Sequence, residues 1–199
     1  MRRILLPLAA VIVLLFGACA DEGSPVIAGD TTTSSTPTTI GATTSTAPST
    51  GGFATTTVST PPLERGLLQS VAATADGGVD RVTFTFEGPL PGYRIGYIER
   101  PIIQDGSGEE ITVDGAAVLG VHFEPASGFD LSGEGRQVYA GPNRLDLATR
   151  RVLDVVRTGD FEANLEWAVG VDVAGTGFRV RTASAPNRIV LEVEVPPGS

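Results

Sequence analysis

The sequence predicts an all-β fold: an antiparallel β-sandwich preceded by a signal peptide and a disordered tether rich in Thr, Ser and Pro. Three observations support this prediction. An apolar run opens the chain, Thr and Ser dominate residues 31–60, and apolar residues alternate with polar ones beyond residue 69. With 199 residues, of which 41% are hydrophobic, the chain suffices for one such domain. We therefore expect a signal peptide over 1–18, a linker over 19–66 and the β-sandwich over 67–199.

The N-terminal residues have the composition of a secretory signal peptide. Arg2 and Arg3 precede an apolar run over 4–16, and small residues follow it. The run is shorter than the roughly 20 residues that a membrane-spanning helix needs. We therefore expect export from the cytoplasm rather than a transmembrane anchor.

The only cysteine, Cys19, stands where the apolar run ends. The stretch Leu15–Cys19 resembles a bacterial lipobox, in which small residues precede a cysteine that becomes the mature N-terminus. This resemblance implies cleavage after Ala18 and a diacylglyceryl group on Cys19; a plain signal peptide that contains a cysteine is the alternative. Because two or more acyl chains hold a protein stably on a membrane, we expect a lipoprotein on the extracytoplasmic face of the cell membrane.

A tether of low complexity follows from Gly23 to about Pro62. Thr, Ser, Pro, Gly and Ala dominate it, so it cannot bury enough apolar surface to offset the entropy of ordering. We expect a disordered spacer with a mean span of roughly 30–40 Å. Its composition is also that of an O-glycosylated stalk, which is a hypothesis from composition alone.

Strands are predicted beyond the tether, where apolar and polar residues alternate between Gly, Pro, Asn and Asp breaks. Val82, Phe84 and Phe86, for example, alternate with Thr83 and Thr85. The expected strands are Gln69–Ala75, Val79–Glu87, Tyr93–Arg100, Glu110–Val113, Ala117–Phe123, Arg151–Arg157, Ala163–Val171, Phe178–Thr182 and Arg188–Val195. A helical turn within Leu145–Val156 is left open. Such short strands are typical of an antiparallel sandwich, although a barrel-like closure is not excluded.

Composition excludes several classes of function. The net charge is −9 and Lys is absent, which argues against nucleic acid, because phosphate binding needs clustered cations. One Cys and one His rule out a disulfide framework, a cysteine-based zinc site and a multi-histidine metal centre. No Gly-x-Ser-x-Gly motif is present. The sequence therefore predicts a protein that is not an enzyme and that carries no cofactor.

Three groups of charged or titratable residues can be interpreted either as chemically active or as purely structural. The acids Asp160, Glu162 and Glu166 are close enough in sequence for glycoside chemistry, but solvated acids on a β-surface are commoner. His122 lies in a predicted strand, where we expect a structural or surface role. The acidic stretch 105–110 resembles a calcium loop but lacks the full ligand spacing, so a hairpin turn is favoured.

Several segments of the folded part resemble one family. The opening of the AMIN-like domain of actinobacterial envelope lipoproteins is similar to Val79–Gly88 followed by Pro91–Tyr97. The middle of that domain is similar to Gly159–Glu162 followed by the Trp167 strand, and its C-terminal part is similar to Phe178–Val193. The resemblance implies a β-sandwich. AMIN domains are non-catalytic modules of cell-wall amidases and secretion proteins that bind peptidoglycan or localise their partners. The resemblance thus implies peptidoglycan binding, or an interaction module that positions an envelope enzyme or transporter.

Arginines supply the first candidate ligand-binding residues. Arg179 and Arg181 are two apart in one strand and should share a face, and Arg188 begins the next strand. Guanidinium groups suit carboxylates, which peptidoglycan stem peptides carry. The alternative is that these arginines are paired with Glu192 and Glu194.

Aromatic residues supply the second candidate. Tyr93 and Tyr97 lie four apart on one strand face, either as an exposed aromatic strip that contacts a ligand or as core or edge packing. Trp167 alternates with Leu165 and Val169, so it is expected in the core rather than as a sugar-stacking platform.

Overall fold

Strand β3 (Val79–Glu87) shows how the alternation builds a sheet with one buried face. Val82, Phe84 and Phe86 are at most 3% exposed, whereas Arg81 and the threonines between them lie on the opposite face. The β-branched and aromatic side chains of this strand favour the extended backbone. The strand has the predicted bounds and lies at the centre of a sheet.

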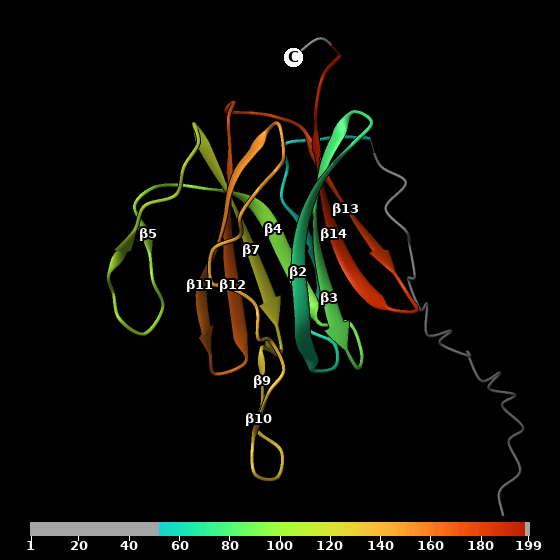
Figure 1. Ribbon diagram of the computed structural model, residues 1–199, viewed down its shortest axis with the longest axis vertical. Helices are drawn as coiled ribbons and strands as arrows, with labels where there is room; N and C mark the ends of the chain where they lie inside the picture. Colours follow the sequence, from blue (N-terminus) through green and yellow to red (C-terminus); the bar gives the residue numbers. More distant parts are fainter. Residues whose placement is uncertain (1–51, 198–199) are drawn as a thin grey trace, which may run out of the picture. The chain divides into compact units, whose positions relative to one another are not determined.

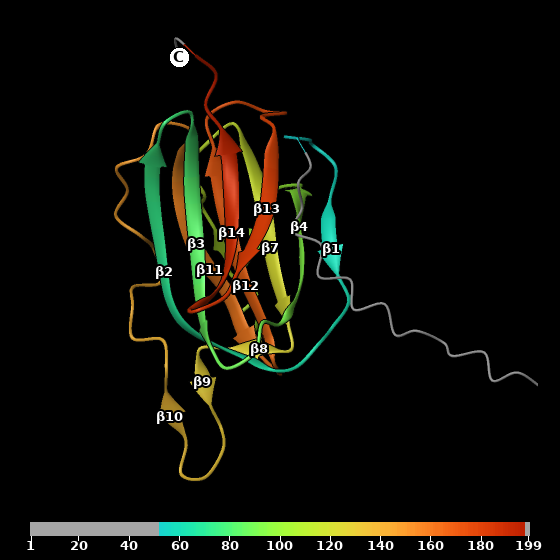
Figure 2. The same cartoon turned by 90° about the vertical axis from the view of Figure 1, so that its right-hand side faces the viewer.

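The computed structural model describes residues 52–197, which form two five-stranded sheets packed as a sandwich (Figures 1 and 2). The first sheet has the order β1–β4–β7–β12–β11, with β1 Val58–Thr60, β4 Gly92–Ile98, β7 Ala117–Glu124, β12 Asn164–Val171 and β11 Val152–Phe161. The second has the order β13–β14–β3–β2–β8, with β13 Phe178–Ala183, β14 Asn187–Glu194, β2 Gly66–Asp76 and β8 Ala126–Ser127. Neighbouring strands are antiparallel except β2 and β8. This confirms the predicted all-β sandwich.

Two short hairpins lie outside the main sheets: β5 (Ile102–Ile103) with β6 (Glu110–Ile111), and β9 (Phe129–Asp130) with β10 (Arg136–Gln137). Residues 105–109 lie in the turn of the first hairpin and Glu110 begins β6, so the predicted hairpin turn in that acidic stretch is confirmed. Ile102 and Ile111 pack against Val118 and Ala168, which lie on the outer side of the first sheet. The β5–β6 hairpin thus covers part of that outer face.

The core between the sheets is centred on aromatic side chains. Phe84 meets Phe123 and Trp167 edge to face, with ring centroids 4.9 and 5.9 Å apart, and Tyr139 meets Trp167 at 5.6 Å. Such edge contacts add to the free energy gained by burial. Trp167 is 1% exposed, which confirms it as a core residue and not a sugar platform.

Strand β3 places a charged residue, Asp80, on its inner face. Asp80 of β3, in the second sheet, is fully buried, and its Oδ2 accepts hydrogen bonds from the N–H groups of Arg150, Arg151 and Val152 at 2.7, 2.5 and 3.0 Å. Val152 is the first residue of β11, in the first sheet. The Asp80 carboxylate therefore connects the two sheets at one end of the sandwich.

Part of the predicted linker belongs to the fold. Val58–Thr60 pair with β4, and Ala54 exchanges two backbone hydrogen bonds with Phe178. The prediction of disorder over 19–66 is therefore wrong for these residues. Amino-acid composition indicates how much apolar side-chain surface a segment can bury. An edge strand, however, is stabilised largely by backbone hydrogen bonds, which composition does not reveal. The predicted signal peptide, Cys19 and residues 20–51 of the predicted linker lie outside the described residues.

Other bounds differ more modestly. The two-residue strands β5, β8, β9 and β10 are too short to show alternation, and the sequence does not predict them. No helix forms in Leu145–Val156, where β11 begins at Val152. Over residues 52–197, no helix is long and apolar enough to cross a membrane.

Candidate functional site

The outer face of the second sheet gathers four arginines. Arg179 lies opposite Glu192 of β14, and Glu192 lies opposite Arg81 of β3, so these three side chains form a row across the sheet. Arg181 follows two residues after Arg179, and Arg188 lies opposite Ala183, which has the same orientation. The prediction that Arg179, Arg181 and Arg188 share a face is therefore confirmed. We call this set, with Arg81, the arginine cluster.

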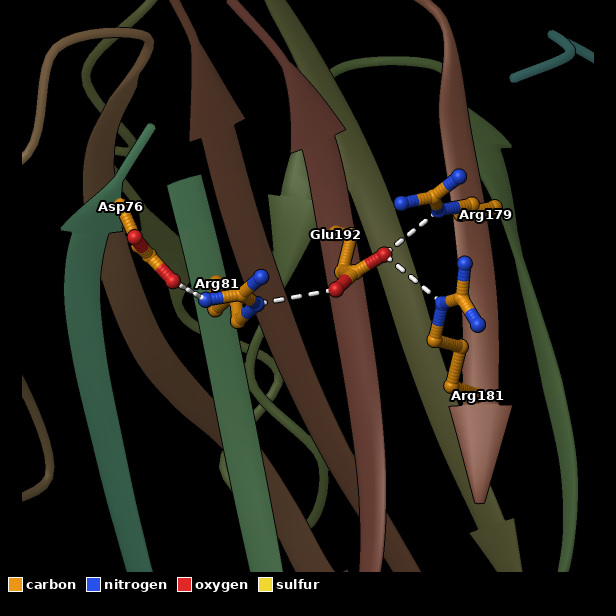
Figure 3. Close-up of polar contacts among 5 residues, drawn as sticks. All are labelled: Asp76, Arg81, Arg179, Arg181 and Glu192. Carbon is orange, nitrogen blue, oxygen red and sulfur yellow. Dashed lines mark hydrogen bonds and ion pairs between the residues drawn. The ribbon is translucent and has the colours of Figure 1, made fainter. Parts of the chain in front are cut away.

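Glu192 is the centre of the arginine cluster, although it is only 4% exposed (Figure 3). It accepts hydrogen bonds from the Nε atoms of Arg81 at 2.8 Å, of Arg179, and of Arg181 at 3.0 Å. Arg81 also pairs with Asp76 at the end of β2. The expected pairing with Glu192 thus holds for two of the three predicted arginines, whereas Glu194 forms no ion pair within residues 52–197.

The sequence does not single out Arg81. Its partner Glu192 is 111 residues away, so no local pattern connects them. One signal was present: Arg81 shares the polar face of β3 with Thr83 and Thr85, which marked it as outward-facing. Only the pairing of β3 with β14 brings it to Glu192.

The cluster holds its central carboxylate ionised. Burial favours the neutral acid, but hydrogen bonds from Arg81, Arg179 and Arg181 outweigh burial and lower the pKa of Glu192 to about 2. The same contact with Glu192, followed by that with Asp76, raises the pKa of Arg81. Glu192 is therefore ionised at neutral pH and lies beside the guanidinium groups of Arg81, Arg179 and Arg181.

The cluster leaves donors unused. Arg179 and Arg181 bind Glu192 through Nε, and in the described part of the chain no protein group accepts from their terminal nitrogens. The Arg181 side chain is 42% exposed, and the Arg179 guanidinium lies 4.4 Å from the centre of the Phe53 ring. The Arg188 side chain also has no hydrogen-bond or ion-pair partner among residues 52–197, and its Nε is enclosed. Guanidinium groups fixed in this way can bind the oxygens of a ligand carboxylate.

The two tyrosines do not form an exposed aromatic strip. Tyr93 and Tyr97 do share a face of β4, but it is the inner face, where Tyr93 is 8% exposed. The Tyr97 hydroxyl donates to the Thr176 carbonyl at 2.7 Å, and its ring packs edge to face on Phe178. Burial raises the pKa of both hydroxyls. Of the two alternatives for these tyrosines, core packing is therefore the one found: Ile95 lies between them on the same face, and all three side chains pack in or against the core.

The acids considered for glycoside chemistry are engaged separately. Asp160 accepts from the N–H of Gly128 at 2.9 Å and faces Arg157. Glu166 contacts His122 Nδ1 at 3.1 Å, on the outer face of the first sheet. Glu162 lies in the β11–β12 turn with a φ of 49°. Within residues 52–197, no group of three or more His, Cys, Asp or Glu side chains is placed to hold a metal ion.

A family comparison completes this description. The AMIN-like domain family matches residues 66–195, from the first residue of β2 to the residue after β14. The chain belongs to the AMIN-like domain family. AMIN domains are typically non-catalytic, and no catalytic family is detected in the chain. No curated protein and no solved structure matches it. The arginine cluster of this AMIN-like domain spans β3, β13 and β14, all within the matched residues.

Proposed function

We propose that this protein is a non-enzymatic lipoprotein of the cell envelope whose AMIN-like domain binds peptidoglycan. The arginine cluster would bind carboxylates of the stem peptides. The observation that carries the proposal is the set of guanidinium groups on one face with unused donors, in a chain whose net charge is −9. On such an acidic chain, a local excess of cations favours a ligand that presents discrete carboxylates.

The geometry supports carboxylate recognition in particular. Glu192 holds Arg179 and Arg181 through one nitrogen each, which limits the motion of both side chains before a ligand arrives. A pre-ordered guanidinium loses less conformational entropy on binding than a free one. The side of each guanidinium that faces away from Glu192 then offers paired N–H donors, which match the two oxygens of a carboxylate.

Membrane attachment would come from lipid on Cys19. We expect the full-length chain to stay with the membrane fraction of expressing cells after a high-salt wash, and the Cys19→Ser variant to move to the soluble fraction. The physical reason is that acyl chains, not charges, would hold the protein. Immunoblots of the fractions measure this, with Ser24→Ala as the matched control. Release of the unchanged protein by mild salt would contradict the anchor.

Binding to the wall is tested by sedimentation with isolated peptidoglycan. We expect the detergent-solubilised full-length protein to co-sediment, and the double variant Arg179→Gln/Arg181→Gln to bind about tenfold more weakly or worse, because each charge-assisted hydrogen bond contributes about 1.5–3 kcal/mol. The double variant Arg136→Gln/Arg150→Gln is the control, since it removes the same charge from exposed positions outside the cluster.

A second variant separates binding from folding. Arg188→Gln leaves the three bonds to Glu192 intact, so it should fold normally and still weaken sedimentation. If the cluster variants and the control variant co-sedimented equally with peptidoglycan, the proposed role of the arginine cluster would be contradicted. Sedimentation no greater than that of an unrelated acidic protein would remove peptidoglycan as the ligand.

One observation favours a second function, a protein-interaction module that positions an envelope enzyme or transporter. Beside the β9–β10 hairpin, which projects from one end of the sandwich in Figure 1, a hollow of about 610 Å³ is lined by Phe129, Leu131 and Phe161. These side chains are 41%, 69% and 59% exposed, and exposed apolar patches often mark interfaces. Photo-cross-linking from position 131 in membranes separates the two functions: a stoichiometric protein partner, with sedimentation unaffected by the cluster variants, favours the second.

A further inference from the structure

The outer face of the first sheet carries a second row of polar side chains, on the opposite side of the sandwich from the arginine cluster. Arg94 of β4 lies directly opposite His122 of β7, and His122 lies opposite Glu166 of β12. All three point away from the core, because Ile95, Val121 and Leu165, their neighbours in sequence, point into it. The row therefore crosses three adjacent strands of one sheet.

A hollow of about 150 Å³ lies beside this row. Gly96 and Gly120, which face each other across β4 and β7, contribute to its lining; the side chain of Thr57 lies over Gly96 and that of Ile98 lies over Gly120. Thr57, from the segment before β1, and Thr158 of β11 contribute to its lining. The hollow is therefore a small recess on the sheet, beside three ionisable side chains.

The charges along the row are separated. The His122 ring lies between two carboxylates, with Nδ1 at 3.1 Å from Glu166 and Nε2 at 3.7 Å from Glu124. Arg94 is exposed, and within residues 52–197 its side chain has no hydrogen-bond or ion-pair partner. One end of the row thus presents an unpaired cation, and the other end presents the Glu166 carboxylate two strand spacings away, about 10 Å between backbones. Glu124 lies on β7, one strand spacing from β4.

We propose that this hollow binds a small zwitterionic amino acid. Its carboxylate would pair with the Arg94 guanidinium and its ammonium group with Glu166. A cavity of about 150 Å³ holds a molecule the size of benzene, with six non-hydrogen atoms, which is also the size of alanine. A simple anion would meet repulsion from Glu124 and Glu166, and a simple cation would meet repulsion from Arg94, so only a ligand with both charges satisfies both ends.

The test is a titration of the full-length protein, in detergent, with alanine, followed by the amide NMR signals of Gly96 and Gly120. We expect saturable shifts of both signals with alanine, and no saturable shift with acetate or methylammonium alone. Arg94→Gln and Glu166→Gln should each raise the half-saturating concentration about tenfold, the loss expected when one charge-assisted contact is removed. Arg150→Gln is the control, because it removes an exposed arginine elsewhere on the chain.

Distinct outcomes would overturn the proposal. Saturation by acetate alone would make the hollow a plain anion site, and shifts that grow linearly with alanine would show no site. Because Glu166 also contacts His122, the melting temperature of Glu166→Gln is compared with that of the unchanged protein; a folded variant with unchanged affinity would overturn the role of Glu166. The double variant Arg179→Gln/Arg181→Gln should titrate normally, so this result does not depend on peptidoglycan binding.

Discussion

Replacing Asp80 by Ala is expected to lower the free energy of unfolding by about 3–5 kcal/mol, enough to leave little of a typical domain's stability. The fully buried carboxylate accepts three backbone hydrogen bonds, from Arg150, Arg151 and Val152. Alanine would leave these donors without their acceptor where the two sheets meet. Urea unfolding followed by circular dichroism measures the change.

A graded series makes the Asp80 prediction sharper. Asp80→Asn keeps one acceptor oxygen without the charge, so its loss should be intermediate. Asp146→Ala removes an exposed carboxylate four residues before Arg150 and should change stability by less than about 0.5 kcal/mol. If Asp80→Ala were no more destabilising than Asp146→Ala, the hydrogen bonds of Asp80 between the sheets would contribute nothing to the free energy of unfolding.

Acidification is expected to destabilise the domain through Glu192. Its pKa is about 2 in the folded protein against an ordinary value of 4.5, so the folded state binds the proton more weakly than the unfolded chain. The stabilisation is therefore complete above about pH 5 and is lost as the pH falls towards 2. At about 1.36 kcal/mol for each unit of pKa, the loss amounts to about 3 kcal/mol.

Glu192→Gln tests this assignment, because glutamine does not titrate. The difference in unfolding free energy between the unchanged protein and the variant should narrow by about 3 kcal/mol from pH 5 to pH 2. Glu64→Gln, at an exposed position, serves as the control for general acid effects. Parallel stability curves for the unchanged protein and Glu192→Gln would show that Glu192 contributes no acid sensitivity.

The sequence predicts the fold well where strands are long enough to alternate. Strand β3 has the predicted bounds because polar and buried apolar residues alternate without interruption from Arg81 to Phe86. The short strands show no such alternation, because β8 and β9 are two residues each and β1 lies in a Thr- and Ser-rich stretch. Strands β1 and β8 are positioned by backbone hydrogen bonds to the distant strands β4 and β2, and β9 by those to β10 in its own hairpin; side-chain patterning does not encode these bonds.

The candidate site was predictable in part for the same reason. Spacing two residues apart places Arg179 and Arg181 on one face, and the alternation of Ile95 with Arg94 already indicated that Tyr93 and Tyr97 point inward. What spacing cannot give is the register between strands. Arg81 reaches Glu192 across 111 residues, and His122 reaches Glu166 across 44, through pairings that exist only in the folded sheets.

The N-terminal segment of the described chain has a mechanical consequence. Ala54 is bonded to Phe178 of the second sheet, Val58–Thr60 are bonded to β4 of the first, and the ring of Phe53 covers the Arg179 guanidinium. Tension applied to the chain before Phe53 is borne first by these contacts and only afterwards by the core. A pull from that direction would lift the ring from Arg179 while the sandwich stays folded, which couples force on the chain to exposure of the cationic face.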